Sequence, residues 1–201
     1  MPKQTFYNLA EEKQQKLLTA AQQEFSASPL AEASIANIVK AAGVPRGSFY
    51  QYFEDKEDLY LYLLDGMMKD RKKALEDILE RCDGDLFEAL PEFYKTTLKE
   101  EKGLSEFRKN IFLNMTDKVE STFAKILINE EMADTVEKIE TMIDVNRLNV
   151  SDDQELIHLL KIIFAVMMRN QVERFSKNLT DEQSLANYSA ELELLKKGLA
   201  R

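Results

Sequence analysis

Side chains that can donate hydrogen bonds to phosphate oxygens or base edges are concentrated between residues 46 and 52. They are Arg46, Ser48, Tyr50, Gln51 and Tyr52. Arginine and glutamine can bind base edges, whereas hydroxyl groups mostly bind phosphates. If one helix presents these groups together, its exposed face has the chemistry needed to enter a major groove of DNA.

The residues before this set predict a helix over about 35–42 that would hold it in place. Ser34 stands where a helix-capping hydroxyl is favoured. Apolar residues follow at helical spacing, namely Ile35, Ile38, Val39 and Ala42. Gly43 suits a left-handed residue that ends a helix, and Pro45 suits the start of the next one. Two helices joined by a sharp turn are therefore expected.

The second helix, over 46–52, is too short to be stable alone. Phe49 and Phe53 lie four residues apart and can anchor one face to the first helix. The polar face then remains exposed, as in a helix-turn-helix. On these residues alone a second interpretation stays open, because small helical proteins also contain such corners without binding DNA.

Several positions of this segment together resemble the DNA-binding segment of the TetR/AcrR family of bacterial transcriptional regulators. The matching residues are Ala42, Gly43, Val44, Gly47, Ser48, Tyr50, Phe53, Lys56 and Leu59. The resemblance implies an all-α protein with an N-terminal three-helix helix-turn-helix domain, 1–55, and a C-terminal helical effector and dimerisation domain, 56–201. It also implies a DNA-binding set of Ser34, Pro45, Arg46, Gly47, Ser48, Tyr50, Gln51, Tyr52 and Lys56.

Within that set the resemblance assigns different roles. Ser34 would cap its helix and contact a phosphate, and Lys56 would contact a phosphate from the next helix. Tyr50 and Tyr52 would bind the DNA backbone. Two positions depart from the family pattern. Pro45 stands where serine is common, and Ala36 stands where some members have a long basic side chain. Base reading is therefore expected to depend chiefly on Arg46 and Gln51.

The composition indicates a helical protein and argues against several other classes. The chain has 201 residues, with only six glycines and four prolines. The single cysteine, Cys82, excludes an intrachain disulfide, and His158 is the only histidine, so we expect no metal site and no cofactor. There is no phosphate-binding glycine loop and no nucleophile beside a base, so an enzyme is not expected. Without a membrane-length apolar run or a signal peptide, a cytoplasmic location is expected.

The net charge of −9 opposes nonspecific attraction to DNA. The expected contact surface nevertheless carries Lys40, Arg46 and Lys56, and Lys3, near the N-terminus, is expected to add to its positive charge. Local charge at the docked surface can therefore favour binding while the whole chain is acidic.

Further helices are expected upstream and downstream of this segment. Asn8 and Glu11 resemble a capping pair that starts a helix ending near 26–29. Later helices are predicted over 56–82, 86–101, 104–115, 117–146, 152–177 and 181–199. Ser151 with Glu155, and Thr180 with Gln183, look like helix starts. Pro91 predicts a kink or a later start in its helix.

The last two predicted helices have broad apolar faces, which could form an intrachain core or a dimer interface. The resemblance favours a four-helix dimer interface, with Leu156, Leu160, Ile163, Phe164, Leu185, Tyr188, Leu192 and Leu195. It also implies an effector pocket in the middle of the chain. The candidate lining residues are Phe93, Phe107, Ile111, Met115, Phe123, Met167 and Asn170.

These features together predict a homodimeric repressor that binds a palindromic double-stranded DNA operator and is released by a small apolar or amphipathic effector. No membrane partner is expected. The alternative is a DNA-binding adaptor whose C-terminal helices recruit a protein partner. An enzyme with a vestigial helix-turn-helix is a third possibility that no residue pattern favours.

Overall fold

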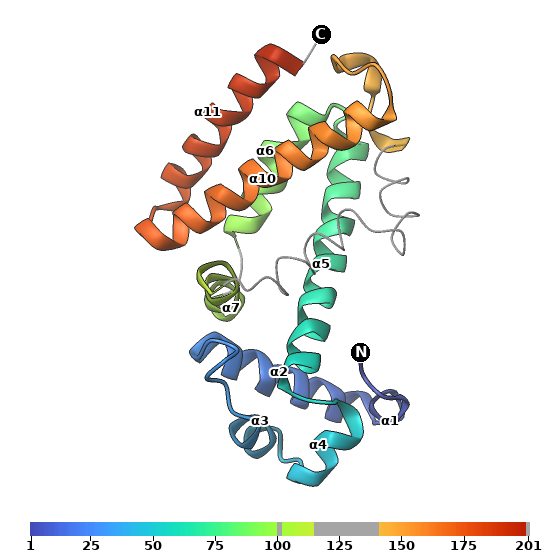
Figure 1. Ribbon diagram of the computed structural model, residues 1–201, viewed down its shortest axis with the longest axis vertical. Helices are drawn as coiled ribbons and strands as arrows, with labels where there is room; N and C mark the ends of the chain where they lie inside the picture. The colour runs from blue at the N-terminus through green and yellow to red at the C-terminus, as the bar shows by residue number, and fades with distance from the viewer. Residues whose placement is uncertain (100–101, 115–140, 200–201) are drawn as a thin grey trace. The chain divides into compact units, whose positions relative to one another are not determined.

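The computed structural model describes residues 1–99, 102–114 and 141–199, and the regular elements in these ranges are helical (Figure 1). This confirms the predicted all-α class. The chain divides into two compact units, one comprising 1–69 with 101–126 and the other 70–100 with 127–201. The boundary between these compact units differs from the functional boundary predicted between residues 55 and 56. That functional boundary stays a prediction.

The first unit contains the short helices at the N-terminus, the beginning of a long helix and one later helix. They are α1 (Gln4–Tyr7), α2 (Glu11–Ala27), α3 (Ile35–Ala42), α4 (Arg46–Tyr52), the first part of α5 (Lys56–Arg81) and α7 (Lys102–Leu113). These helices enclose a core in which Leu17, Phe25, Ile38 and Phe49 are fully buried. Val44, in the turn between α3 and α4, is half-buried.

Helix α7 packs on α2 and completes this core. The Phe25 ring lies 6.3 Å from the Phe107 ring and 5.1 Å from the Tyr60 ring, between centroids. The side-chain amide of Asn110 donates to the carbonyls of Phe25 and Ser26, at 3.0 and 2.9 Å. These bonds satisfy carbonyls near the C-terminal end of α2, which the helix itself leaves without partners.

The predicted start of α2 at Asn8 is wrong. Asn8 ends α1, and α2 begins at Glu11 after Ala10, whose side chain provides no cap. The reason is that Phe6, fully buried, holds residues 4–7 in a turn of their own. The local pattern of Asn8 and Glu11 does not reveal this tertiary anchor.

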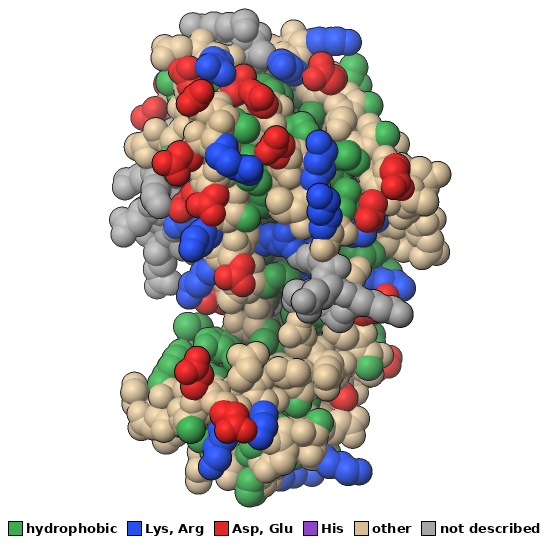
Figure 2. Space-filling model, turned by 180° about the vertical axis from the view of Figure 1, so that it is seen from behind, with side chains coloured by type: hydrophobic (Ala, Val, Ile, Leu, Met, Phe, Trp, Pro, Cys, Tyr) green, Lys and Arg blue, Asp and Glu red, His purple; other side chains and the backbone are tan. Residues whose placement is uncertain are grey.

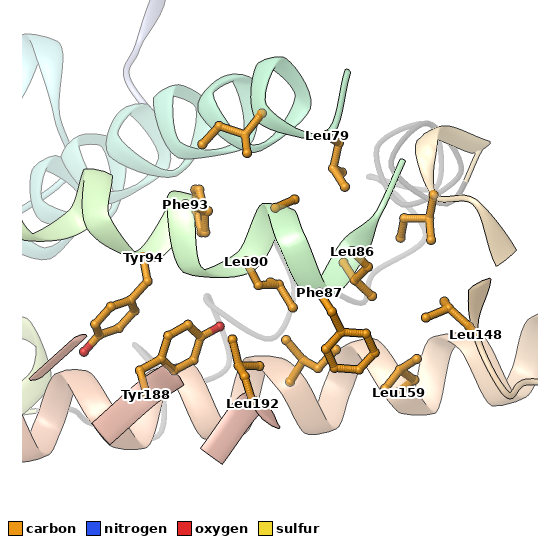
Figure 3. Packing of buried hydrophobic residues seen from close by; sticks show 14 of the residues in the cluster. Leu79, Leu86, Phe87, Leu90, Phe93, Tyr94, Leu148, Leu159, Tyr188 and Leu192 are labelled. Carbon is orange, nitrogen blue, oxygen red and sulfur yellow. The ribbon is translucent and has the colours of Figure 1, made fainter. Parts of the chain in front are cut away.

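The second unit is built around a hydrophobic cluster (Figure 3). Its elements are the remainder of α5, α6 (Leu86–Leu98), the 3-10 turn η2 (Val145–Arg147), α10 (Asp153–Lys177) and α11 (Asp181–Leu199). In Figure 3 the rings of Tyr94 and Tyr188 lie face to face, with centroids 4.2 Å apart. The hydroxyls of Tyr94 and Ser184 are 2.7 Å apart, and burial raises the pKa of the Tyr188 phenol. Aromatic packing and buried polar pairing thus join α6 to α11.

The predicted helix ends are partly confirmed. At α11 the backbone N–H of Thr180 donates to Gln183 at 3.0 Å, and the backbone N–H of Gln183 donates to the Thr180 hydroxyl at 3.2 Å. This reciprocal pair is the predicted capping box. At α10 the cap is Asp152, and the expected Ser151–Glu155 pair contributes one bond of 2.7 Å outside the cap.

Helix α6 runs through Pro91, so the later start is wrong. The Asp85 carboxylate accepts from the backbone N–H of Glu88 at 3.0 Å and starts the helix ahead of the proline. Buried Leu86 and Phe87 hold that first turn. The helices predicted over 86–101 and 104–115 end earlier, at Leu98 and Leu113. Most of the helix predicted over 117–146 lies outside the described residues, and its last two residues, Val145 and Asn146, belong to the turn η2.

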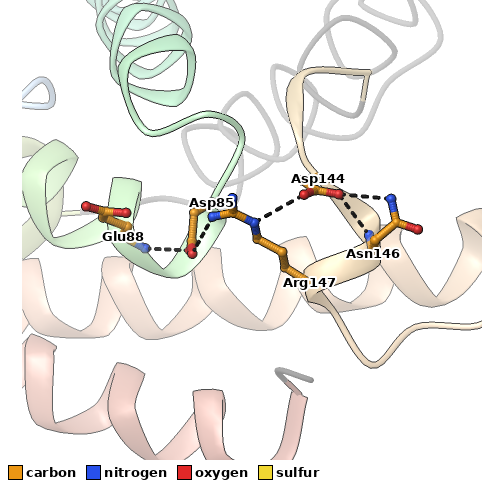
Figure 4. A network of polar contacts seen from close by, with 5 residues as sticks. All are labelled: Asp85, Glu88, Asp144, Asn146 and Arg147. Atoms are coloured by element: carbon orange, nitrogen blue, oxygen red, sulfur yellow. Dashed lines mark hydrogen bonds and ion pairs between the residues drawn. The ribbon is translucent and has the colours of Figure 1, made fainter.

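A polar network fixes the corner between α5 and α6 (Figure 4). The Arg147 guanidinium contacts the carboxylates of Asp85 and Asp144, at 3.0 and 3.1 Å. Hydrogen bonds from Asn146 to Asp144, together with the neighbouring Arg147, hold the pKa of the Asp144 carboxyl below its usual value. The segment before α10 is thereby tied to the start of α6.

Candidate nucleic-acid interface

The turn between α3 and α4 has the predicted geometry. Gly43 has φ +67° and ends α3 in the left-handed conformation. The backbone N–H of Val44 donates to the carbonyl of Val39 at 2.9 Å, which closes the end of the helix. Pro45 then precedes the first residue of α4, where its fixed φ suits helix initiation.

Two buried phenylalanines anchor α4, as predicted. Phe49 and Phe53 are fully buried, and their ring centroids lie 6.0 Å apart. The opposite side of the helix is open, because Gly47 and Gln51 are exposed, and Arg46 is exposed at the start of the helix. Tyr50 retains 44% of its accessible surface. Helix α4 therefore presents hydrogen-bonding groups on its exposed face, while the buried rings on its other face hold it in place.

The remaining residues of the predicted DNA-binding set differ in their exposure. Ser48 and Tyr52 are half-buried, whereas Pro45 is exposed. Ser34 precedes α3 as predicted, but its hydroxyl makes no capping bond. Instead, the Glu24 carboxylate of α2 accepts from the backbone N–H of Ser34 at 2.7 Å. Ten residues separate these partners, so no local capping pattern identifies Glu24.

Lys56 has a structural contact that the sequence did not reveal. Its ammonium donates to the carbonyls of Ala31 and Ala33, at 2.7 and 2.9 Å. Lys56 therefore ties the loop before α3 to the start of α5. An ammonium has three N–H donors, so one remains for the phosphate contact that the resemblance implies.

Some exposed basic residues lie in or beside α1, α3 and α4, while others of the first unit, such as Lys13 and Lys16, lie on α2. Lys3 precedes α1, Lys40 is on α3 and Arg46 begins α4. On the face shown in Figure 2, basic side chains appear at the end of this unit that is drawn lowest, with acidic side chains beside them, and both kinds are interspersed over the other unit. The local charge at α3 and α4 thus differs from the net acidity of the chain.

The residues predicted for a dimer interface fall into two groups. Leu156, Ile163, Tyr188 and Leu192 are at most 3% exposed and belong to the core of the second unit. They have almost no surface left to bury against another copy, so the intrachain interpretation applies to them. The other four, which are Leu160, Phe164, Leu185 and Leu195, are half-buried.

The residues predicted to line an effector pocket are distributed over both units. Phe107 and Ile111 are core residues of the first unit, whereas Phe93 and Met167 belong to the second. Met115 and Phe123 lie outside the described residues. The buried Asn170 amide donates to the Val166 carbonyl at 2.9 Å and to the Glu191 carboxylate at 2.5 Å. Its side chain is therefore already engaged between α10 and α11.

We predict that Gly47→Ala raises the free energy of unfolding by up to about 1 kcal/mol, because alanine favours a helix more than glycine does. A Cβ at Gly47 meets no atom within 4 Å, so no clash opposes this gain. The added methyl lies on the exposed face of α4 and is expected to weaken DNA binding. Urea denaturation and fluorescence anisotropy with a duplex selected from a random pool measure the two effects separately. Unchanged DNA affinity would remove Gly47 from the contact surface.

In the part of the chain that the structure describes, no helix has the length and apolar character needed to cross a membrane.

Sequence comparisons match both parts of the chain. The family model for bacterial regulatory proteins of the tetR family matches residues 17–63. The model described as Tetracyclin repressor-like, C-terminal domain, matches residues 85–199. The transcriptional regulator EthR of Mycobacterium tuberculosis is 36% identical over 64 residues, which are 32% of this chain and 30% of that protein. The uncharacterised regulator YvdT of Bacillus subtilis is 38% identical over 85 residues, 42% of this chain and 40% of that protein. These matches thus span well under half of either relative.

Comparison with solved structures supports the same fold. SmeT, the repressor of the Stenotrophomonas maltophilia multidrug efflux pump SmeDEF, has a TM-score of 0.68 at 17% identity, over 95% of this chain and 93% of that one. FadR of Bacillus subtilis, solved in complex with stearoyl-CoA, has a TM-score of 0.65 at 18% identity, over 90% of this chain and 96% of that one. The C-terminal family model alone covers more than half of the sequence. The chain therefore belongs to the TetR family of bacterial transcriptional regulators.

Proposed function

We propose that the protein is a transcriptional repressor that binds a palindromic DNA operator as a homodimer and is released by a small-molecule effector. The observation that carries the proposal is the amphipathic arrangement of α4. Phe49 and Phe53 are fully buried on one side, while Arg46 and Gln51 are exposed. A short helix held in this way can enter a major groove without losing its anchor.

The proposed contacts divide into base reading and backbone positioning. Arg46 and Gln51 face the bases, because their side chains can form paired hydrogen bonds with guanine and adenine respectively. Ser34, Ser48, Tyr50 and Tyr52 bind the phosphate backbone with their hydroxyls. Lys56 uses its remaining donor on a phosphate. Pro45 and Gly47 allow the start of α4 to approach the DNA closely, since neither carries a long side chain.

Homodimerisation is proposed through α10 and α11. Besides the half-buried Leu160, Phe164, Leu185 and Leu195, this pair of helices exposes Ile162 at 47% and Leu194 at 68%. A twofold dimer would carry two copies of α4, which suits half-sites separated by about 34–36 Å, one turn of DNA. Pairing would also compensate for the small number of base-reading residues in each copy.

Release by an effector is proposed as a shift between two conformations of the dimer. Helix α5 contributes residues to both compact units, so a ligand that favours one position of α5 in the second unit would act on the first. SmeT is the repressor of a multidrug efflux pump, and FadR of Bacillus subtilis was solved in complex with stearoyl-CoA. By analogy, a small apolar or amphipathic effector is proposed for this chain.

A selection from random duplex DNA, followed by light scattering of the complex, tests the proposal. The expected result is a palindromic consensus bound by two copies of the chain. A consensus without symmetry, bound by one copy, would contradict the dimer. Binding of a second protein in place of any small molecule would favour the adaptor alternative. A screen for compounds that raise the melting temperature and release the selected duplex tests the effector.

Arg46→Ala is predicted to reduce the discrimination between the selected duplex and random DNA by about 1–3 kcal/mol for each site, because a paired contact with a base is lost. The side chain is exposed, so the free energy of unfolding should change by less than about 0.5 kcal/mol. Competition titrations in anisotropy measure the discrimination. Lys40→Ala is the control, since it removes a positive charge from α3 without removing a proposed base contact. An unchanged sequence preference in Arg46→Ala would show that Arg46 does not read bases.

A further inference from the structure

The C-terminal end of α4 is closed by residues from the beginning of the chain. The backbone N–H of Lys3 donates to the carbonyl of Tyr52 at 2.8 Å, and the Lys3 ammonium donates to the carbonyl of Tyr50, also at 2.8 Å. The Thr5 hydroxyl donates to the carbonyl of Gln51. We call residues 3–7 the N-terminal arm.

These contacts complete the hydrogen bonding of the last turn. A helix leaves its last four carbonyls without partners inside the helix. In α4 the first of the four, that of Phe49, accepts from the backbone N–H of Phe53 at 2.9 Å. The arm supplies donors for the other three. The Lys3 ammonium also stands at the negative end of the helix dipole, where a positive charge is favourable.

A buried aromatic residue holds the arm against α4. Phe6 is fully buried, and its ring centroid lies 5.0 Å from that of Phe53 and 6.5 Å from that of Tyr52. Tyr62 of α5 contacts the same ring at 5.6 Å. The arm is therefore packed between the end of α4 and α5, so its donors are held in place rather than reaching in from solvent.

We propose that Lys3 and Thr5 are positioning residues for DNA recognition, because the arm closes the end of α4 and fixes the direction of its exposed side chains. The carbonyls that the arm binds belong to Tyr50, Gln51 and Tyr52, the residues of α4 with proposed DNA contacts beyond its first turn. A helix of this length has little stability of its own. Fraying of its last turn would redirect Gln51 away from the bases. The part of this inference that concerns DNA rests on the proposed function, whereas the closure of α4 does not.

The double variant Lys3→Met/Thr5→Val tests the proposal, since it removes both side-chain donors and nearly preserves side-chain size. Amide hydrogen exchange is measured in the protein without DNA. The expected result is about tenfold faster amide exchange at residues 50–53, which corresponds to losing the net stabilisation of one or two hydrogen bonds. Exchange at Leu17 and Ile38 should be unchanged. Lys3→Arg/Thr5→Ser keeps both donors and should restore slow exchange. Lys95→Met, at an exposed site of α6, is the control for lost charge.

Affinity for the selected duplex is then measured against salt concentration. The expected result is binding about tenfold weaker in the double variant, with the same salt dependence as in Lys95→Met. Unchanged exchange in α4 overturns the proposal. If exchange in α4 is unchanged but DNA binding is weaker and its salt dependence shallower, Lys3 contacts a DNA phosphate and does not position α4. If the wild type selects no duplex, the proposed function fails, while the exchange result still decides whether the arm closes α4.

If the double variant destabilised the whole unit, exchange at Leu17 and Ile38 would become faster as well. In that case the single variant Thr5→Val decides whether the arm closes α4, because it removes one uncharged donor and leaves the Lys3 contacts in place. Faster exchange confined to α4 in that variant supports the closure by the arm. Wild-type exchange throughout α4 would overturn it.

Discussion

Gly84→Ala is expected to lower the free energy of unfolding of the second unit by about 2–5 kcal/mol. Gly84 has φ +75°, a conformation that costs a residue with a Cβ about 1–2 kcal/mol. An added Cβ would also lie 2.6 Å from the carbonyl oxygen of Met142 and 2.8 Å from the backbone nitrogen of Asp144. Relieving such an overlap typically costs a further 1–3 kcal/mol or so, because backbone atoms must move.

The movement would disturb more than one contact. The backbone N–H of Asp144 donates to the carbonyl of Gly84 at 3.0 Å. Separating these two segments would also stretch the ion pairs by which Arg147 joins Asp85 to Asp144. The expected consequence is a loosened start of α6, since Asp85 caps that helix.

Urea denaturation followed by far-ultraviolet circular dichroism measures the loss. The chain lacks tryptophan, and the stacked Tyr94 and Tyr188 of the second unit contribute to a near-ultraviolet signal that all seven tyrosines share. Gly43→Ala is the matched control. Gly43 also has positive φ, but a Cβ there meets nothing within 4 Å, so only the conformational cost of about 1–2 kcal/mol applies. Equal losses in the two variants would show that residues 142–144 move aside easily.

What could be predicted from the sequence is largely what is local in it. The turn at Gly43 and the capping box of Thr180 and Gln183 involve residues at most five apart, and both are present. The spacing of Phe49 and Phe53 likewise identified the buried face of α4, since helical periodicity alone fixes which residues share a face. The resemblance added the expected roles of the exposed residues.

What could not be predicted depends on residues distant in the chain. Glu24 binds the start of α3, Asn110 binds the end of α2, and Lys3 with Thr5 binds the end of α4. Each is a side chain of ordinary type in an ordinary local context, and only the tertiary arrangement gives it a helix end as a partner. The same limit applies to Leu156 and Leu160, because periodicity marks both as apolar but does not show which one the chain buries itself.

Phe49→Ala and Tyr50→Ala are both expected to weaken DNA binding, but only Phe49→Ala is expected to lower the stability strongly, although the residues are adjacent. Removing the fully buried Phe49 ring should cost about 3–5 kcal/mol of unfolding free energy, since the cavity left under α4 cannot be filled by its neighbours without movement. DNA binding would be lost with it, because α4 has no other way to stay folded than its packing and its closed ends.

In Tyr50→Ala the free energy of unfolding should change by less than about 1 kcal/mol, because the ring is 44% exposed and its main contact is an edge-on approach to Phe49. Affinity for DNA should still fall, by about tenfold, through loss of a phosphate contact. Denaturation and anisotropy on the same two proteins separate the roles, and Tyr50→Phe tests the hydroxyl alone. A large loss of stability in Tyr50→Ala would place that ring in the support of α4, and the exposed face would then have lost one of its proposed DNA contacts.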